Sequence, residues 1–155
     1  MAEDLLQEKT SFQNSIVAFL EEAGVSDIVS IAYDTQFALK GAKFMLSVQN
    51  FPSVVLTKRF AFPDGDPFEF EQSAIRANNR DSVVRVRVDR EKKVALFSVS
   101  VICTSPEAFL VSFPSYLRVM DDTEAIVVGL FQSSECTLLE RNDSQSESRT
   151  IPERD

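Results

Sequence analysis

The chain has 155 residues, of which 44% are apolar and 26% are charged, and this composition suits a single globular domain. Its 24 Asp and Glu against 16 Lys and Arg give a formal charge of −8, which disfavours binding to nucleic-acid phosphates. The chain has no histidine and only two cysteines, which excludes His-containing catalytic triads, His-ligated zinc or haem and four-thiolate metal sites, so we expect no cofactor.

The first predicted element is a helix within residues 3–23. Glu3 and Asp4 suit the positive end of the helix dipole, and Gly24 is the expected left-handed stop. The apolar residues fall on one face at helical spacing: Leu5, Phe12, Ile16, Phe19 and Leu20.

Residues 26–43 give the weakest pattern. Fragments rich in β-forming residues at 28–33 and 36–39 precede a turn at Lys40 and Gly41. We therefore allow for an extra strand near residues 28–33.

Two strands follow, at residues 44–49 and 54–62, because apolar and polar side chains alternate there. Lys58 lies on the apolar phase of the second strand. The sequence leaves two explanations for it: a side chain that extends to solvent at a sheet edge, or a bulge that shifts the phase.

A second helix is predicted from Pro67 to about Ala77, with Asp66 as the N-cap and Glu69 three residues after it. It ends at two asparagines, which tolerate the left-handed conformation.

A hairpin around residues 90–93 follows. If Asp89 pairs with Val94, apolar side chains lie opposite one another, whereas a register one residue off would oppose arginines to them. The expected pairs are Val88 with Ala95, Val86 with Phe97, and Val84 with Val99.

The last helix begins at Ser105 as N-cap, followed by Pro106. Pro114 lies within its apolar stripe and predicts a kink or a restart. We interpret Asp121 and Asp122 as a cap for a further segment at 123–131; adjacent helical residues point about 100° apart, which disfavours a catalytic dyad or a metal site. The stripe comprises Phe109, Phe113, Leu117 and Met120.

Residues 133–155 contain six acidic residues and three arginines, and we predict a disordered acidic tail after a single domain at 1–132. The start of the chain is acidic and no stretch reaches the ~20 apolar residues that cross a bilayer. We therefore expect a cytoplasmic protein that does not bind membranes, with Cys103 and Cys136 reduced. The predicted fold class is α+β, an antiparallel sheet with helices packed on one face, in the order α-β-β-α-β-β-α.

Residues 68–132 contain a helix that ends in residues 74–79, a valine hairpin at 83–101 and a Ser-Pro-Glu start of the last helix at 105–110. In these features they resemble the YbjN-like bacterial sensory-transduction regulator domain and its structural relatives, the type III secretion chaperones. It implies a chaperone-like or regulatory protein without enzymatic activity, which binds another protein or an extended peptide segment and often forms a homodimer.

Helices on one face of a sheet leave the other face open. There the hairpin carries Val83, Arg85, Arg87, Leu96, Ser98 and Ser100, and the preceding strand carries Val55, Thr57, Arg59 and Ala61. The plain interpretation is a solvated face whose arginines limit aggregation. The functional one is a docking surface for an acidic or extended partner. Its predicted residues are Arg59, Val83, Arg85, Arg87 and Leu96.

An alternative function is a ligand-sensing domain with an apolar pocket between sheet and helices, which draws on the 13 phenylalanines. An enzyme that uses only carboxylates, Lys, Arg or Tyr is a third, weaker hypothesis. We predict that the protein is not an enzyme.

Overall fold

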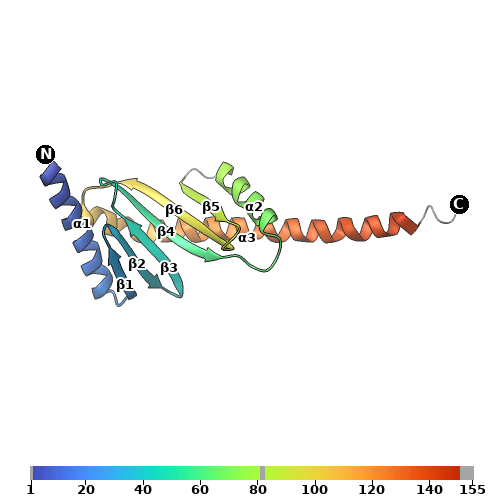
Figure 1. Cartoon of the computed structure of the whole chain (residues 1–155), viewed down its shortest axis with the longest axis horizontal. Helices are drawn as coiled ribbons and strands as arrows, with labels where there is room; N and C mark the ends of the chain where they lie inside the picture. The colour runs from blue at the N-terminus through green and yellow to red at the C-terminus, as the bar shows by residue number, and fades with distance from the viewer. Residues whose placement is uncertain (1, 81–82, 151–155) are drawn as a thin grey trace.

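The structure, a computed structural model, describes the main chain of residues 2–80 and 83–150. It describes their side chains except those of residues 2, 79–80 and 135–150. The helices over these residues are α1 (Ala2–Glu22), α2 (Pro67–Arg80) and α3 (Pro106–Thr150) (Figure 1). The strands are β1 (Ser26–Ile31), β2 (Asp34–Leu39), β3 (Ala42–Ser47), β4 (Ser53–Ala61), β5 (Val84–Asp89) and β6 (Val94–Ile102).

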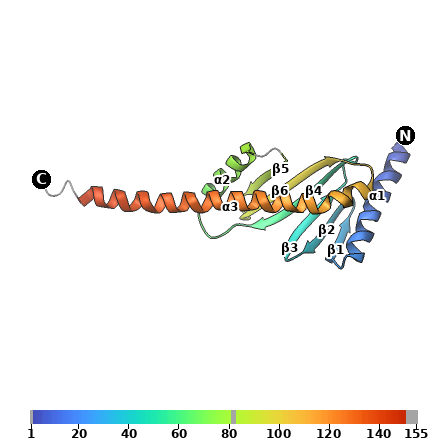
Figure 2. The same ribbon diagram turned by 180° about the vertical axis from the view of Figure 1, so that it is seen from behind.

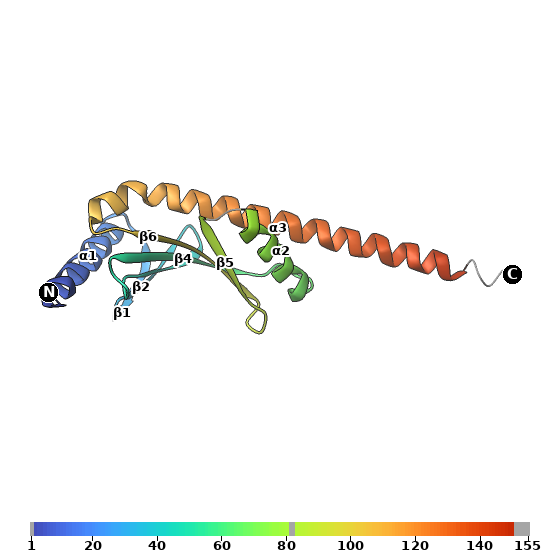
Figure 3. The same cartoon turned by 90° about the horizontal axis from the view of Figure 1, so that it is seen from above.

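The strands form one antiparallel sheet in the order β1-β2-β3-β4-β6-β5. α3 runs along one side of this sheet, with α1 near the β1 end and α2 near β5 (Figures 2 and 3). Within the described residues no helix lies along the opposite side (Figure 3). The predicted α+β class, with helices on one face of an antiparallel sheet, is confirmed.

The segment before α2 differs from the expected order, because it holds four strands where we expected two and allowed for a third. The fragments at 28–33 and 36–39 became β1 and β2, and the turn at Lys40 and Gly41 is present with φ of 52° and 79°. β1 is hard to predict because five of its six residues are exposed and its pairing with β2 is irregular after Ser26. A strand with so little burial has no apolar alternation to detect.

The hairpin register predicted from side-chain pairing is confirmed. Asp89 pairs with Val94, and the valines of β5 lie opposite the apolar residues of β6. Burial of these residues drives the register, since a shift by one would place Arg85 and Arg87 in the core.

The core lies between the sheet and the helices and is rich in phenylalanine. The ring of Phe12 on α1 lies 5.5 Å from that of Phe51 and 5.9 Å from that of Phe109, measured between centroids. At the other end, Phe70 on α2 lies 5.3 Å from Phe131 on α3. The three helices and the connection between β3 and β4 are thus joined by ring contacts of the kind that stabilise cores.

Gly65, in the connection between β4 and α2, lies directly against the ring of Phe131. Its φ of 149° suits glycine, and a Cβ there would collide with the ring. Phe131 itself is only 2% exposed. The glycine therefore lets the connection close over the last buried ring of α3.

α3 corrects two predictions. It is one helix through Pro114, so the expected restart is absent, and Asp121 and Asp122 lie inside it instead of capping a new segment. α3 continues to Thr150, and residues 151–155 lie outside the described part. The division into a domain at 1–132 and a disordered tail at 133–155 stays a prediction. None of the helices in the described part is long and apolar enough to span a bilayer.

The outer edge of β5 is closed by a side chain. The amide of Asn78 on α2 donates from Nδ2 to the carbonyl of Val86 at 2.9 Å and accepts from its N–H at 2.7 Å. An added strand would use the same two main-chain groups, so Asn78 blocks pairing at this edge.

Candidate functional site

The candidate site is the side of the sheet away from the helices, which we call the open face. Successive strand residues point to opposite faces, so the neighbours of each buried strand residue lie here. Its cations come from β3, β4 and β5: Lys43, Arg59, Arg85 and Arg87. Its larger aliphatic residues are Val29, Met45, Val55, Leu96 and Ile102.

The register brings most of the predicted site residues together. Arg59 on β4 pairs with Leu96 on β6, and Leu96 pairs with Arg87 on β5. Arg85 lies two residues further along β5, opposite Ser98. Val83 differs from the rest because it precedes the first residue of β5; its side chain is 56% exposed.

All four cations of the open face are exposed, and none of them takes part in an ion pair among the described residues. The chain as a whole carries a charge of −8. Carboxylates of Asp27, Asp89 and Glu91 line the same surface hollows as most of these cations, but cations outnumber carboxylates in each hollow. This surplus of positive charge favours acidic groups.

Lys43 is a cation of the open face that sequence reasoning missed. It lies directly opposite Arg59 in the pairing of β3 with β4. The predicted strand starts at residue 44, one position too late to include Lys43. The sequence pattern indicates this position, because Lys43 and Met45 alternate with the buried Phe44 and Leu46 along the strand.

Lys58 lies on the helix-covered face of the sheet and, unlike the cations of the open face, is paired with carboxylates. Its Nζ lies 2.9 Å from Asp121 Oδ1 and 3.1 Å from Glu124 Oε1, both on α3. Burial alone would lower the pKa of Lys58, but the hydrogen bonds and charges of these carboxylates raise it above its ordinary value. Both expected explanations are wrong, because the register of β4 continues without a bulge and β4 is an inner strand.

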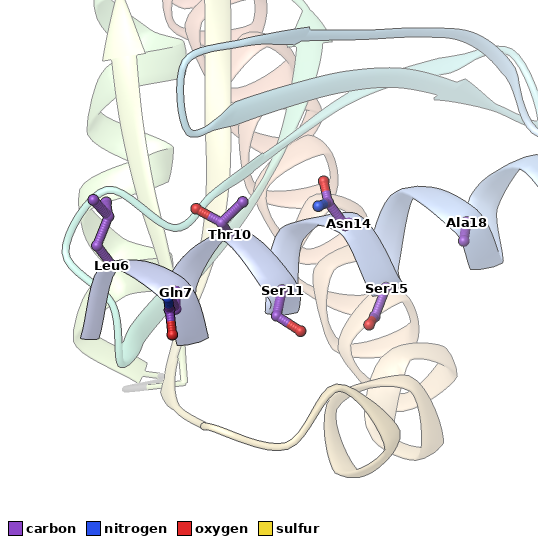
Figure 4. A pocket seen from close by; sticks show the side chains of 7 residues that line it. All are labelled: Leu6, Gln7, Thr10, Ser11, Asn14, Ser15 and Ala18. Atoms are coloured by element: carbon purple, nitrogen blue, oxygen red, sulfur yellow. The ribbon is translucent and has the colours of Figure 1, made fainter. Parts of the chain in front are cut away.

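The surface has three hollows worth comparing. One follows the outer side of α1, where Figure 4 shows uncharged side chains such as Leu6, Thr10 and Asn14. A second, at the end of the β5–β6 hairpin, is lined by Arg59, Arg87 and Leu96 among others. The third lies on the open face across β1, β2, β3, β4 and β6 and has a volume of about 430 Å³. Two of the three thus border the predicted docking residues.

Metal-binding clusters and reactive cysteines are the other kinds of site to consider in the described residues. Over the described residues, no three Cys, Asp or Glu side chains lie close enough together to hold a metal ion. Cys103 is partly buried and its Sγ donates to the carbonyl of Ser105 at 3.2 Å. The side chain of Cys136 lies outside the described residues.

No family model and no curated protein sequence matches the chain. Among solved structures, YbjN from E. coli matches with 8% identity and a TM-score of 0.51, over 80% of this chain and 92% of its own. A chain of the HopA1–SchA chaperone–effector complex matches with 10% identity and a TM-score of 0.53, over 75% and 94%. An uncharacterized protein from Methanothermobacter thermautotrophicus matches with 9% identity and a TM-score of 0.54, over 79% and 98%.

The chain therefore has the YbjN-like, chaperone-like fold. The resemblance expected from the sequence is confirmed at this level. At 8–10% identity the likeness concerns the fold alone.

Proposed function

We propose that this YbjN-like protein is a non-enzymatic, chaperone-like or regulatory binding module that docks an extended segment of another protein on its open face. Arg59, Arg85 and Arg87 pair with carboxylates of the partner, and Leu96 and Val83 add apolar contact. The observation that carries the proposal is a group of exposed arginines for which the described residues provide no ion pair, on a sheet face that no described helix covers.

The chemistry of the open face supports this role. Arginine presents a planar fork that binds carboxylates with two parallel hydrogen bonds, and it is enriched in protein interfaces. Aliphatic residues between the arginines supply area that a partner can bury. The matched chaperone–effector complex is a precedent for protein binding by this fold.

The core gives less support to a ligand-sensing role. Phenylalanine rings fill the space between sheet and helices, and Phe60, for example, lies 6.2 Å from Phe70 and 6.0 Å from Phe97 between centroids. Interiors packed in this way leave no room for an apolar ligand without rearrangement.

The test uses the double variant Arg85→Glu with Arg87→Glu. We expect it to lose the partner that the native chain captures from cells of its source, with little change in melting temperature, because both side chains are exposed. The matched control is Arg76→Glu with Arg118→Glu, which makes the same charge change on exposed positions of α2 and α3.

Partner capture that survives in the open-face variant would contradict the proposal. Loss of capture in both double variants would also contradict it, since net charge and not the open face would then control binding. Cross-linking of the captured chain to β5 and β6 would locate the contact directly.

We place the protein in the cytoplasm, without nucleic-acid or membrane partners, and we propose that it forms a homodimer as the resemblance implies. Light scattering during size-exclusion chromatography should give a mass near twice the 17.4 kDa of one chain. A monomeric mass at micromolar concentration would overturn the dimer.

A further inference from the structure

A pair of like charges lies across two neighbouring strands of the open face. Lys43 on β3 and Arg59 on β4 are directly opposite each other, and both are exposed. Like charges in this position destabilise a sheet. Neither side chain has an ion pair within the described residues that would offset the repulsion.

The same pair borders the hollow of about 430 Å³ on the open face. Its lining includes the aliphatic side chains of Val29, Met45 and Leu96 around two shorter ones, Ala38 and Thr57. The Thr57 hydroxyl is already hydrogen-bonded to that of Ser98 at 3.0 Å. The hollow is therefore lined mainly by apolar side chains, together with the cations Lys43 and Arg59, the carboxylate of Asp27 and the amide of Gln36.

The repulsion between these two cations lowers the stability of the sheet, and nothing in the local fold requires two cations at these positions. An apolar side chain in the hollow would bury aliphatic surface, and a carboxylate beside it would lie between Lys43 and Arg59. One acidic ligand thus removes the repulsion and gains two charge-assisted hydrogen bonds.

We propose that this hollow binds an apolar side chain of the partner, flanked in the partner's extended segment by acidic residues whose carboxylates pair with Lys43 and Arg59. The inference rests on the proposed function. It specifies the chemistry of the partner segment and the part of the open face that this segment contacts. The arginines of β5 then contact more distant parts of the same segment.

Charge favours this occupant over others. A second copy docked through the same face would bring the cations of one open face against those of the other. Nucleic acid is disfavoured by the net charge of −8. The hollow lies within the roughly 300–1,000 Å³ range of small-molecule sites, so a small apolar acid is the competitor that the experiment must separate.

The experiment compares three short synthetic peptides of equal length by NMR, with the Met45 methyl group as the reporter. The first places one leucine between two pairs of glutamates, the second replaces the leucine by serine, and the third replaces the glutamates by lysines. Only the first should shift the Met45 signal in a saturable way, and rising salt should weaken its binding.

The variants Lys43→Gln and Arg59→Gln test the two cations. Each should weaken binding of the first peptide roughly tenfold, the loss expected for one charge-assisted hydrogen bond. Each should also leave the melting temperature unchanged or raised, because the repulsion is removed. Arg118→Gln, on the exposed side of α3, should change neither property.

Several results would overturn the inference. One is equal binding of the leucine and serine peptides to the native chain. Another is unchanged binding of the first peptide by both Gln variants. The third is a co-purified small acid that native mass spectrometry detects and that the leucine peptide does not displace. If capture depends on Arg85 and Arg87 but Met45 does not respond to the first peptide, this inference fails and the proposed function stands. If capture is independent of Arg85 and Arg87, the proposed function itself fails.

Discussion

Lys58 and Arg59 are neighbours on β4, yet they lie on opposite faces of the sheet and in opposite electrostatic settings. Lys58 is 9% exposed and is paired with two carboxylates of α3. Arg59 is exposed, and its cross-strand neighbour on β3 is another cation. On the helix-covered face a charge is balanced by partners within the chain, whereas on the open face it is not.

The contrast between Lys58 and Arg59 distinguishes a cation that stabilises the fold from a cation that is available for binding. A buried cation must be paired, because an isolated one carries a large desolvation cost. An exposed cation tolerates the absence of a partner and stays available for one from outside. The comparison therefore predicts that changes at Lys58 alter stability and that changes at Arg59 alter binding.

The largest effect is expected for Lys58→Ala. Removal of the cation leaves Glu124, whose side chain is 23% exposed, without its partner, and it also leaves a space between β4 and α3. The free energy of unfolding should fall by about 2–3 kcal/mol, as for a partly buried ion pair that loses one member. Urea denaturation measures this.

Lys58→Met serves as the control, because it retains the packing of the side chain and removes only the charge. It should lose less than Lys58→Ala. Asp121→Asn should lose less than about 1 kcal/mol, since the Asp121 side chain is 64% exposed. Equal stability of Lys58→Ala and the native chain would remove the contrast between the two faces.

The next effect is the pH dependence of the same ion pairs. Because the folded chain raises the pKa of Lys58, the pairs add stability that is fully present below the ordinary lysine pKa. That stability is lost as the pH rises through the raised pKa. The difference in unfolding free energy between the native chain and Lys58→Met should stay constant from about pH 6 to 9 and shrink above about pH 10.5. A decrease already at neutral pH would contradict this.

A smaller effect is expected for Asn78→Ala, which tests the closed edge of the sheet. The substitution removes two hydrogen bonds to Val86 and should cost about 1–2 kcal/mol in thermal or chemical unfolding. It should also increase self-association at high concentration, because the strand edge becomes accessible. Asn14→Ala, at an exposed position of α1, is the matched control and should have neither effect.

The smallest effect is expected for Arg59→Gln, and its sign is opposite to that of the others. Relief of the repulsion from Lys43 should raise the free energy of unfolding by roughly 0.3 kcal/mol at low salt, and the gain should vanish at high salt. A loss of stability would show that Arg59 is a structural residue and would weaken its assignment to binding.

Much of the fold could be predicted from local pattern. The β5–β6 register followed from which side chains lie opposite one another, and both faces of the hairpin were assigned from it. The start of α3 followed from Ser105, whose Oγ accepts from the N–H of Ala108 at 3.2 Å. Each of these features is fixed by residues close together in sequence.

The features that were missed depend on distant or atypical residues. Lys58 and Asp121 are 63 positions apart, so no spacing rule connects them. β1 lacks a buried face and contains Asp27 at a φ of 57°. In the candidate site, the arginines followed from strand phase, whereas the opposition of Lys43 and Arg59 needed the pairing of β3 with β4.

We expect the two parts of α3 on either side of the contact between Phe131 and Gly65 to differ in dynamics. Up to Phe131 the helix is held by buried side chains, whereas beyond it Figure 3 shows the helix extending away from the sheet. Amide hydrogens before this contact should exchange with solvent only when the whole domain opens, and those after it should exchange through local fraying. The glycine thus sets the position along the helix at which cooperative protection ends.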